Sequence, residues 1–209
     1  MAADNQEVEV KFLLSDRSSL EKKLKTAGAK LDQPRVYEIN LRFDTPEGKL
    51  ARNQQVLRLR QDTRARLTFK GPAKFREEVQ SRQELEFTVS SFEMAKALLE
   101  ALGYQVAVMY EKFRATYVYE QTEITLDEMP YGNFAEIEGP DGKAIQAVAR
   151  KLGLDWDRRI LESYMALFDR ARSNLRFSFR DLSFENFKSI QAPPSALGLN
   201  YADQKGGKD

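Results

Sequence analysis

Charged side chains occupy alternate positions in several short segments of this 209-residue chain. The first such segment, EVEVKF, alternates Glu7, Glu9 and Lys11 with apolar residues. Successive side chains of a β-strand point to opposite faces, so this spacing separates a charged face from an apolar one. A single strand of this kind is most simply a half-buried strand whose polar face meets water. The interpretation therefore depends on whether other strands repeat the pattern.

The alternation does recur in later segments. Closure removes the exposed edges of an antiparallel sheet of about eight strands, so such a sheet tends to close. If helices cover the apolar face, the charged face lines a tunnel whose charges must be paired, hydrated or bound to a ligand. Outward display of the charges in water is the alternative. The charged members of the later segments are Arg58 and Arg60, Arg66 and Lys70, Arg82, Glu84 and Glu86, Lys112 and Arg114, Glu123 and Asp127, and Glu136 and Glu138.

A tunnel that gathers acids and bases suits a ligand that needs both, and polyphosphate with a divalent metal ion is such a ligand. Two carboxylates on one strand, as in Glu7 with Glu9 and in Glu136 with Glu138, are natural ligands for a hard cation such as Mg²⁺ or Mn²⁺. Asp127 could supply a further ligand or position a water molecule.

The basic residues on the same faces suit the phosphates. The planar guanidinium groups of Arg58 and Arg60 match phosphate oxygens, and lysines add positive charge. Phosphoryl transfer asks a protein mainly to position groups and neutralise charge, so no covalent nucleophile is required. The predicted substrate-binding residues are Lys11, Arg58, Arg60, Lys70, Glu84, Glu86, Lys112 and Arg114.

Composition excludes several other classes of function. The net charge is only +1, because 33 basic residues nearly balance 32 acidic ones, so no global field indicates nucleic acid or a membrane surface as partner. The chain has no cysteine and no histidine, which excludes disulfides, zinc sites built on thiolate or imidazole, and Ser-His-Asp triads. The start, MAADNQ, does not resemble a signal peptide and no apolar run could span a bilayer, so we expect a cytoplasmic location.

The order of elements predicts an α+β fold, an antiparallel eight-stranded β-barrel with helices packed on its outside. Strands are expected at 7–12, 36–45, 55–62, 65–71, 82–89, 106–119, 122–128 and 133–138. The first helix is expected to begin after a cap at Ser15 or Asp16 and to end at Gly28. A capping box of Ser90 with Glu93 predicts the next helix, which ends at Gly103. Two more are expected over 142–152, capped by Asp141, and over 161–172.

Residues 1–172 are expected to form one tunnel domain. EVEVKFLLSDRSSLEKKLKTAG resembles ELEFTVSSFEMAKALLEALG, which we interpret as two halves of that domain, with chance similarity as the alternative. Residues 173–209 form a C-terminal extension with a flexible end. We expect its phenylalanines to pack back on the domain, and a partner or homodimer surface is the less favoured alternative. These are Phe177, Phe179, Phe184 and Phe187.

Together the motifs resemble the CYTH family, the triphosphate tunnel metalloenzymes that include class IV adenylate cyclases, thiamine triphosphatases and inorganic triphosphatases. The resemblance covers roughly residues 7 to 168 and rests on EVEVK, LRLR, TFKGP, RQELE, EKFR and above all ITLDEMPYGNFAEIEG. It implies an eight-stranded tunnel that acts on triphosphates with Mg²⁺ or Mn²⁺. It also implies a metal site and a phosphate grip: Glu7, Glu9, Glu136 and Glu138 with Asp127 for the metal, and Arg58, Arg60, Lys70 and Arg114 for the triphosphate.

Lys11 and Asp127 are the catalytic candidates. Family analogy makes Lys11 an activator of the attacking water, a task that requires a depressed pKa. Simple phosphate binding is the alternative role for Lys11.

The chain departs from the family just before Ser163. Many members have a basic residue where this chain has Glu162. Two alternatives stay open: either Arg158 or Arg159 from the preceding loop substitutes for the basic residue, or one phosphate contact is missing.

We favour metal-dependent hydrolysis of an inorganic, organic or nucleoside triphosphate, because hydrolysis needs only the features visible in the sequence. Cyclisation of ATP to cyclic AMP and pyrophosphate is the first alternative, and it requires a pocket for the base. A non-catalytic polyphosphate-binding module is the second, although binding phosphate alone would not need so many acids. The expected partner is a small molecule that contains a triphosphate, with no nucleic acid and no membrane.

Overall fold

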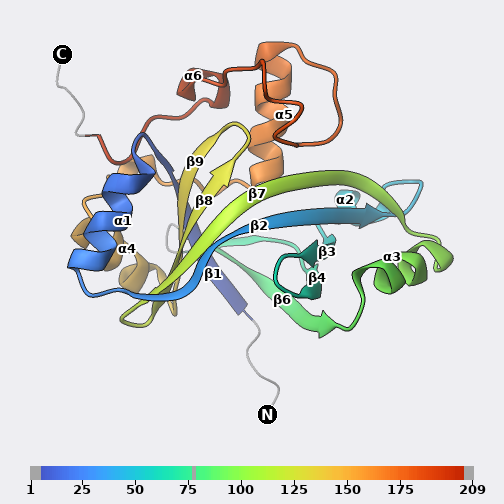
Figure 1. Cartoon of the computed structure of the whole chain (residues 1–209), viewed down its shortest axis with the longest axis horizontal. Coiled ribbons are helices and arrows are strands. Elements are labelled where there is room, and N and C mark those ends of the chain that lie inside the picture. Colours follow the sequence, from blue (N-terminus) through green and yellow to red (C-terminus); the bar gives the residue numbers. More distant parts are fainter. Residues whose placement is uncertain (1–5, 77–78, 205–209) are drawn as a thin grey trace.

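A computed structural model describes residues 6–76 and 79–204 of the chain. The predicted flexible end, beyond residue 204, lies outside these residues. Within them, nine strands form one antiparallel sheet (Figure 1). They are β1 (Gln6–Leu14), β2 (Lys30–Asp44), β3 (Val56–Gln61), β4 (Ala65–Lys70), β5 (Lys74–Arg76), β6 (Val79–Val89), β7 (Gln105–Tyr119), β8 (Thr122–Met129) and β9 (Gly132–Glu138).

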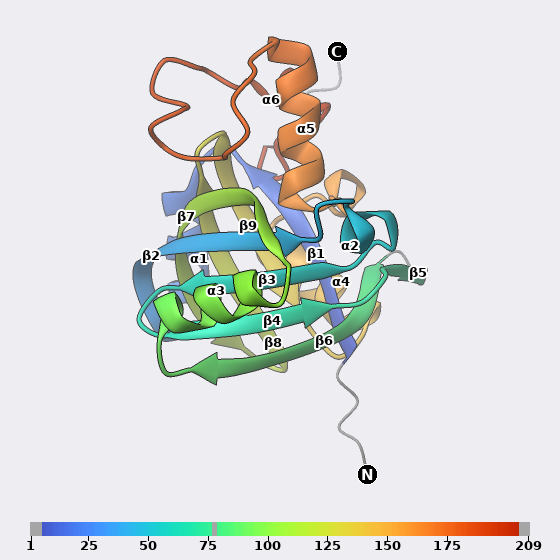
Figure 2. The same cartoon turned by 90° about the vertical axis from the view of Figure 1, so that its right-hand side faces the viewer.

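Eight of the strands close into a ring in the order β1-β9-β8-β7-β2-β3-β4-β6, because β6 also pairs with β1. The closing ladder is short and runs from Gln6 opposite Gln83 to Glu9 opposite Gln80. β5 pairs with the first residues of β6 beside this ring, and Figure 2 shows it next to the start of β6. The predicted fold of eight antiparallel strands that close, with helices outside, is confirmed, and one short strand is added to it.

The largest error in the predicted strands concerns β2, which begins at Lys30 and not at residue 36. Pro34 has no N–H to donate, so its presence predicts an interruption of the strand. β2 continues past Pro34 because its pairing with β7 shifts register between Gln33 and Val36. β2 and β7 are consequently the two longest strands and lie side by side (Figure 1).

Helices flank the ring. In the part of the chain that the structure describes, no helix is long and apolar enough to cross a membrane. The four-residue helices and the 3-10 helix were not predicted. The helices are α1 (Arg17–Thr26), α2 (Lys49–Arg52), α3 (Phe92–Ala101), α4 (Gly142–Lys151), the 3-10 helix η1 (Trp156–Arg158), α5 (Tyr164–Leu175) and α6 (Pro194–Leu197).

Two of the predicted helix caps are confirmed. The side chain of Asp16 accepts a hydrogen bond from the N–H of Ser19 at the start of α1. The side chain of Asp141 accepts one from the N–H of Ala144 at the start of α4. Each satisfies an N–H that the first turn of a helix leaves without a partner.

The other two helix starts were predicted wrongly. α3 is capped by Ser91 and not by Ser90, and Ser91 accepts from the N–H of Met94, so the capping box with Glu93 does not form. α5 begins at Tyr164 and not at residue 161, because Ser163 caps it. In both cases two or more polar residues precede the helix, and the apolar pattern alone does not select among them.

The apolar core lies between the ring and its helices, not inside the ring. α1 and α4 pack on β1, β8 and β9 in one cluster that includes Leu24, Ile145 and Phe12. α3 packs on β2 and β3 through Leu99 and Leu59. Figure 1 shows α1 and α4 on one side of the sheet and α3 at its far end. The apolar face of the strands is therefore the outer face.

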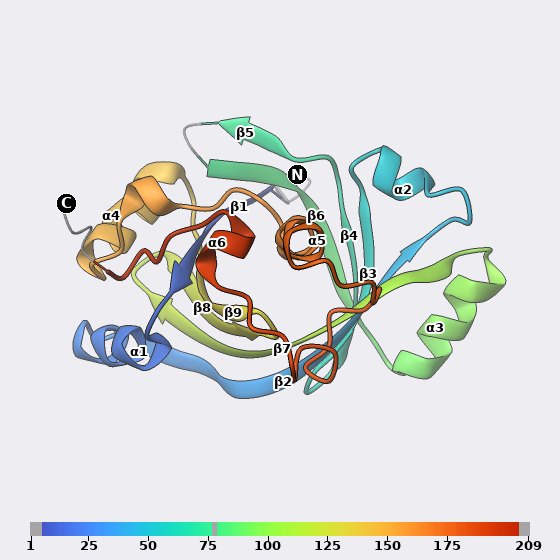
Figure 3. The same cartoon turned by 90° about the horizontal axis from the view of Figure 1, so that it is seen from above.

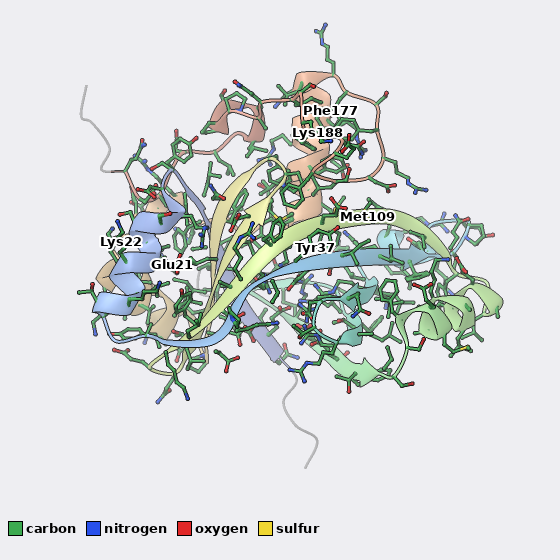
Figure 4. The ribbon with its side chains drawn as sticks, viewed as in Figure 1. Glu21, Lys22, Tyr37, Met109, Phe177 and Lys188 are labelled. Carbon is green, nitrogen blue, oxygen red and sulfur yellow. The ribbon has the colours of Figure 1, made fainter. Side chains whose placement is uncertain are left out.

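A third apolar cluster joins α5 to the C-terminal extension. Phe168 of α5 contacts the rings of Phe177, Phe179 and Phe187, and the rings of Phe177 and Phe179 stack at 4.1 Å. Figure 4 shows Phe177 beside α5. The predicted packing of these aromatic residues on the domain is confirmed. The division of the chain at residue 172 stays a prediction.

The C-terminal extension also forms hydrogen bonds with the end of β1 and the turn that follows it. Asp203 accepts hydrogen bonds from the N–H groups of Ser15 and Asp16, at the turn between β1 and α1. The N–H of Ala202 donates to the carbonyl of Leu13. Residues near the end of the described chain therefore fix the end of β1, the strand that carries Glu7 and Glu9.

Candidate active site

The ring encloses a cavity of about 430 Å³ with mostly charged walls. The charged rows therefore face inward, and the alternative of outward display is wrong. Figure 3 views the ring along α5, which is seen nearly end-on above it. Of the predicted site residues, all but Asp127 line the cavity: Glu7, Glu9, Lys11, Arg58, Arg60, Lys70, Glu84, Glu86, Lys112, Arg114, Glu136 and Glu138.

Carboxylates face one another on one wall of the cavity. Glu138 of β9 lies between Glu9 of β1 and Glu123 of β8 in the strand register. Like charges that are directly opposite in a sheet repel each other. Burial raises the pKa of Glu138 to about 8, with Glu7 and Glu9 adding to the rise. Burial and the charge of Glu136 raise the pKa of Glu9 to about 7. This wall therefore carries more negative charge than its neighbours balance.

Glu7, on the same wall, is balanced by bases. Its carboxylate accepts hydrogen bonds from Lys70 Nζ at 2.7 Å and from Arg82 Nε at 3.0 Å. Burial alone would raise the pKa of Glu7, but the charges of Lys70 and Arg82 outweigh it and lower the pKa to about 2. Glu7 is therefore held as an anion by its partners.

Lys11 lies between two of the predicted metal ligands. Its Nζ is 2.6 Å from Glu9 Oε1 and 3.4 Å from Glu136 Oε2. Burial alone would lower the pKa of Lys11, but the carboxylates of Glu136 and Glu9 outweigh it and hold that pKa above its ordinary value. The depressed pKa that a general base requires is not found here, and Lys11 is a charge partner in this structure.

The arginines of β3 form the opposite wall. Arg60 Nη2 lies 3.1 Å from both carboxylate oxygens of Glu86. Arg58 Nη2 is 3.4 Å from Glu86 Oε2, and its Nη1 is 3.4 Å from the hydroxyl of Tyr110. The Nε atoms of both arginines are buried without a hydrogen-bond partner among the described residues. Each guanidinium therefore keeps a donor for a further acceptor.

Asp127 lies behind the cavity wall and is fully buried. Its carboxylate accepts hydrogen bonds from Arg114 Nε and Nη2, both at 2.6 Å, and from Lys112 Nζ at 3.1 Å. The hydroxyl of Tyr164 donates a further one at 2.8 Å. These contacts are those of a group that positions Arg114 and Lys112, and a metal-binding role for Asp127 stays a prediction.

The start of α5 covers one end of the cavity. Ser163, Tyr164 and Met165 line it. The ring of Tyr164 lies 5.6 Å from Nζ of both Lys11 and Lys112. This distance allows a cation–π contact with each ammonium group.

Among the described residues that line the cavity, neither arginine of the loop before Ser163 stands in for a basic residue at position 162. Glu162 pairs with Arg170 on the outer side of α5. Arg158 donates to the carbonyl of Tyr201, and Arg159 donates to the carbonyl of Trp156. Neither Arg158 nor Arg159 is among the described residues that line the cavity.

Sequence reasoning missed the part of the wall that β2 supplies. Glu38 and Arg42 line the cavity, and the side chain of Asn40 is fully buried between them. The signal was present, because these three polar residues alternate with Ile39 and Leu41 as in the other strands. Tyr110, Arg82 and Glu123 also line the cavity without having been predicted as site residues.

The acidic wall fits a divalent cation by its chemistry. In the described residues, no three acidic side chains are already gathered as a metal site, because their carboxylates turn toward basic partners. Yet Glu9 and Glu138 oppose each other, and burial together with neighbouring carboxylates raises the pKa of both groups. Oxygen ligands of this kind are those that Mg²⁺ and Mn²⁺ prefer.

Divalent metal is expected to stabilise the protein, and more strongly at pH 8 than at pH 5. The pKa values of Glu9 and Glu138, about 7 and 8, exceed the 4.5 of a free carboxyl. Without metal, stability therefore falls as pH rises from about 4.5 to 8, since the folded state resists losing these protons. Metal replaces the protons and restores that stability.

Thermal unfolding with Mn²⁺ or EDTA measures this effect. Metal at one hundred times its dissociation constant contributes about 2.7 kcal/mol. That raises Tm by roughly 5–10 °C in a chain of this size. A metal-induced rise in Tm that is equal at pH 5 and pH 8, or no rise at either pH, would contradict the proposed ligands.

Comparisons with known proteins agree with this geometry. A family model for the CYTH domain matches residues 5–163. A solved structure from Vibrio parahaemolyticus, named provisionally as an adenylate cyclase, is 23% identical, with a TM-score of 0.69 over 78% of this chain and 97% of that one. A protein of Pyrococcus horikoshii is 26% identical, with a TM-score of 0.65 over 77% of this chain and 98% of that one. A Hippeastrum protein, named provisionally as an adenylyl cyclase with a dominant triphosphatase activity, is 20% identical, with a TM-score of 0.60 over 78% of this chain and 95% of that one. No curated protein matches the chain at a significant level.

Proposed function

Because the chain belongs to the CYTH family, we propose that it hydrolyses a triphosphate, with Mg²⁺ or Mn²⁺ as cofactor, inside the cavity of the ring. The observation that carries the proposal is the separation of charge within one cavity. Carboxylates with raised pKa gather on β1 and β9, and arginines with free donors lie on β3. A chain of phosphates with a divalent ion complements both walls. The triphosphatase activity in the name of the Hippeastrum protein supports this choice.

Glu9, Glu136 and Glu138 would hold the metal ion, with Glu7 beside them. All line the cavity on neighbouring strands β1 and β9. A divalent ion bound there would neutralise phosphate oxygens and polarise the phosphorus under attack. Lys11 stays next to Glu9 and Glu136, where its ammonium group binds a phosphate oxygen when metal occupies the carboxylates.

Arg58, Arg60, Lys70 and Arg114 would grip the remaining phosphates. Water attacks the terminal phosphorus, and the bond from that phosphorus to its bridging oxygen breaks. The attacked phosphorus becomes orthophosphate, the diphosphate part of the substrate is the leaving group, and the proton that water loses passes to solvent. The basic residues bind the charge that moves onto the bridging oxygen. Asp127 orients Arg114 through two hydrogen bonds, so the guanidinium is preorganised before substrate binds.

A substrate panel tests this reaction. Inorganic tripolyphosphate, thiamine triphosphate, ATP and GTP are each supplied with Mg²⁺ or Mn²⁺, and orthophosphate, pyrophosphate and cyclic nucleotides are measured. We expect metal-dependent release of orthophosphate and none in EDTA, because the reacting phosphate needs a cation between it and the acidic wall. Cyclic AMP and pyrophosphate as the main products from ATP would instead identify the protein as an adenylate cyclase. Binding without turnover of any substrate would identify a phosphate-binding module.

A further inference from the structure

Arg42 is a cavity arginine that is not ion-paired to a carboxylate among the described residues. Its side chain lines the cavity and is partly buried. Among the described residues it forms no hydrogen bond and no ion pair. By contrast, Lys70, Arg60 and Arg114 lie 2.7, 3.1 and 2.6 Å from a carboxylate oxygen. Arg42 therefore contributes positive charge to the cavity that Asp169 attracts from a distance but no described carboxylate pairs with.

The strand register places this charge against another one. Arg42 of β2 lies directly opposite Arg58 of β3, and like charges in this position repel each other. Burial lowers the pKa of Arg42, and the charges of Arg82 and Arg58 lower it further, against the opposing effects of Tyr110 and Asp169. The Nε atom of Arg58 is buried without a partner. Two neighbouring guanidinium groups thus hold donors that no described acceptor satisfies.

On the basis of the function proposed above, we propose that Arg42 and Arg58 form an anion subsite for the end of a linear polyphosphate. In the ring order, β2 and β3 lie across from β1 and β9, which carry the acidic wall. A chain whose reacting phosphate meets the acidic wall therefore directs its other end toward β2 and β3. A phosphate there satisfies the free donors and separates the two guanidinium charges.

The subsite sets a preference among substrates. Inorganic tripolyphosphate, or a longer linear polyphosphate, is anionic along its whole length and reaches Arg42 with a phosphate. A nucleoside triphosphate would place a neutral ribose against Arg42 and leave its donors unsatisfied, which costs binding energy. The preferred substrate is therefore an inorganic polyphosphate chain and not a nucleotide.

Titration calorimetry in EDTA tests the subsite without metal or turnover. Arg42→Ala is expected to weaken binding of inorganic tripolyphosphate by at least about tenfold, since a hydrogen bond to a charged group contributes about 1.5–3 kcal/mol. The same substitution is expected to weaken binding of ATP by a clearly smaller factor. Arg42→Lys is expected to fall between the wild type and Arg42→Ala, because a lysine keeps the charge but not the fork of donors. Arg52→Ala, which removes an exposed arginine of α2, is the control for net charge and is expected to bind as the wild type does.

The possible results distinguish a failure of the proposed subsite from a failure of the proposed hydrolysis. Unchanged tripolyphosphate binding by Arg42→Ala, or an equal loss for tripolyphosphate and ATP, would overturn the subsite while hydrolysis could still stand. A wild type that binds tripolyphosphate through Arg42 but hydrolyses no triphosphate would contradict only the proposed reaction. Arg42→Gln, measured beside Arg42→Ala with a thermal unfolding curve for each, keeps the test valid if the alanine variant unfolds.

Discussion

Replacing Glu138 with Gln is expected to lower metal-dependent hydrolysis of tripolyphosphate by at least about a hundredfold, because a metal ligand supplies several kcal/mol of charge stabilisation. Glu138 faces Glu9 and Glu123 in neighbouring strands, and burial with nearby carboxylates raises its pKa to about 8. Gln keeps the shape of the side chain and removes the charge that metal would neutralise. It also relieves repulsion, so the metal-free variant is expected to be no less stable than the wild type.

The measurements are kcat/KM with Mg²⁺ and thermal unfolding in EDTA. Glu120→Gln is the matched control, because Glu120 is an exposed acid that pairs with Lys151 outside the cavity. Full activity in Glu138→Gln would show that the metal site is misassigned. An equal loss in Glu120→Gln would show that the effect comes from net charge and not from a ligand.

Replacing Asp127 with Ala is expected to destabilise the protein by about 3–5 kcal/mol, because it removes the carboxylate nearest to both Lys112 and Arg114 in a buried cluster. Asp127 holds Arg114 through two hydrogen bonds, Lys112 through one and the hydroxyl of Tyr164 through another. The expected fall in Tm is roughly 6–20 °C. Hydrolysis is expected to fall as well, since Arg114 loses its fixed orientation.

Unfolding in EDTA separates the two roles that Asp127 could have. A group that only ligates metal would leave the stability of the metal-free protein unchanged, and that result would contradict a positioning role. Asp157→Ala, at an exposed position of η1, is the control for loss of a surface aspartate and is expected to stay within about 0.5 kcal/mol of the wild type.

The sequence was sufficient for the arrangement of charge because a strand has a strict period of two. Once one face of EVEVKF is apolar, Glu7 and Glu9 must share the other face, and helices can cover only one of the two. The same rule places Glu38 and Arg42 in the cavity as well, because both residues alternate with the apolar Ile39 and Leu41 of β2.

Other features could not be predicted because they depend on contacts between distant residues. The position of Asp127 behind the wall follows from its pairing with Arg114 and from Tyr164, which α5 brings to that point. Nothing in the local sequence shows that Arg158 turns toward the carbonyl of Tyr201 and away from the cavity. The pKa of Lys11 depends likewise on Glu136, which lies on a strand far along the chain.

The most direct measurement is a crystal structure with tripolyphosphate and Mn²⁺, in which anomalous scattering locates the metal. We expect manganese inside the ring at Glu9, Glu136 and Glu138, and phosphates extending from there toward Arg58 and Arg42. Manganese and tripolyphosphate bound only on the outer surface, with Lys11 still paired to Glu9 and the cavity free of both, would contradict a site inside the ring.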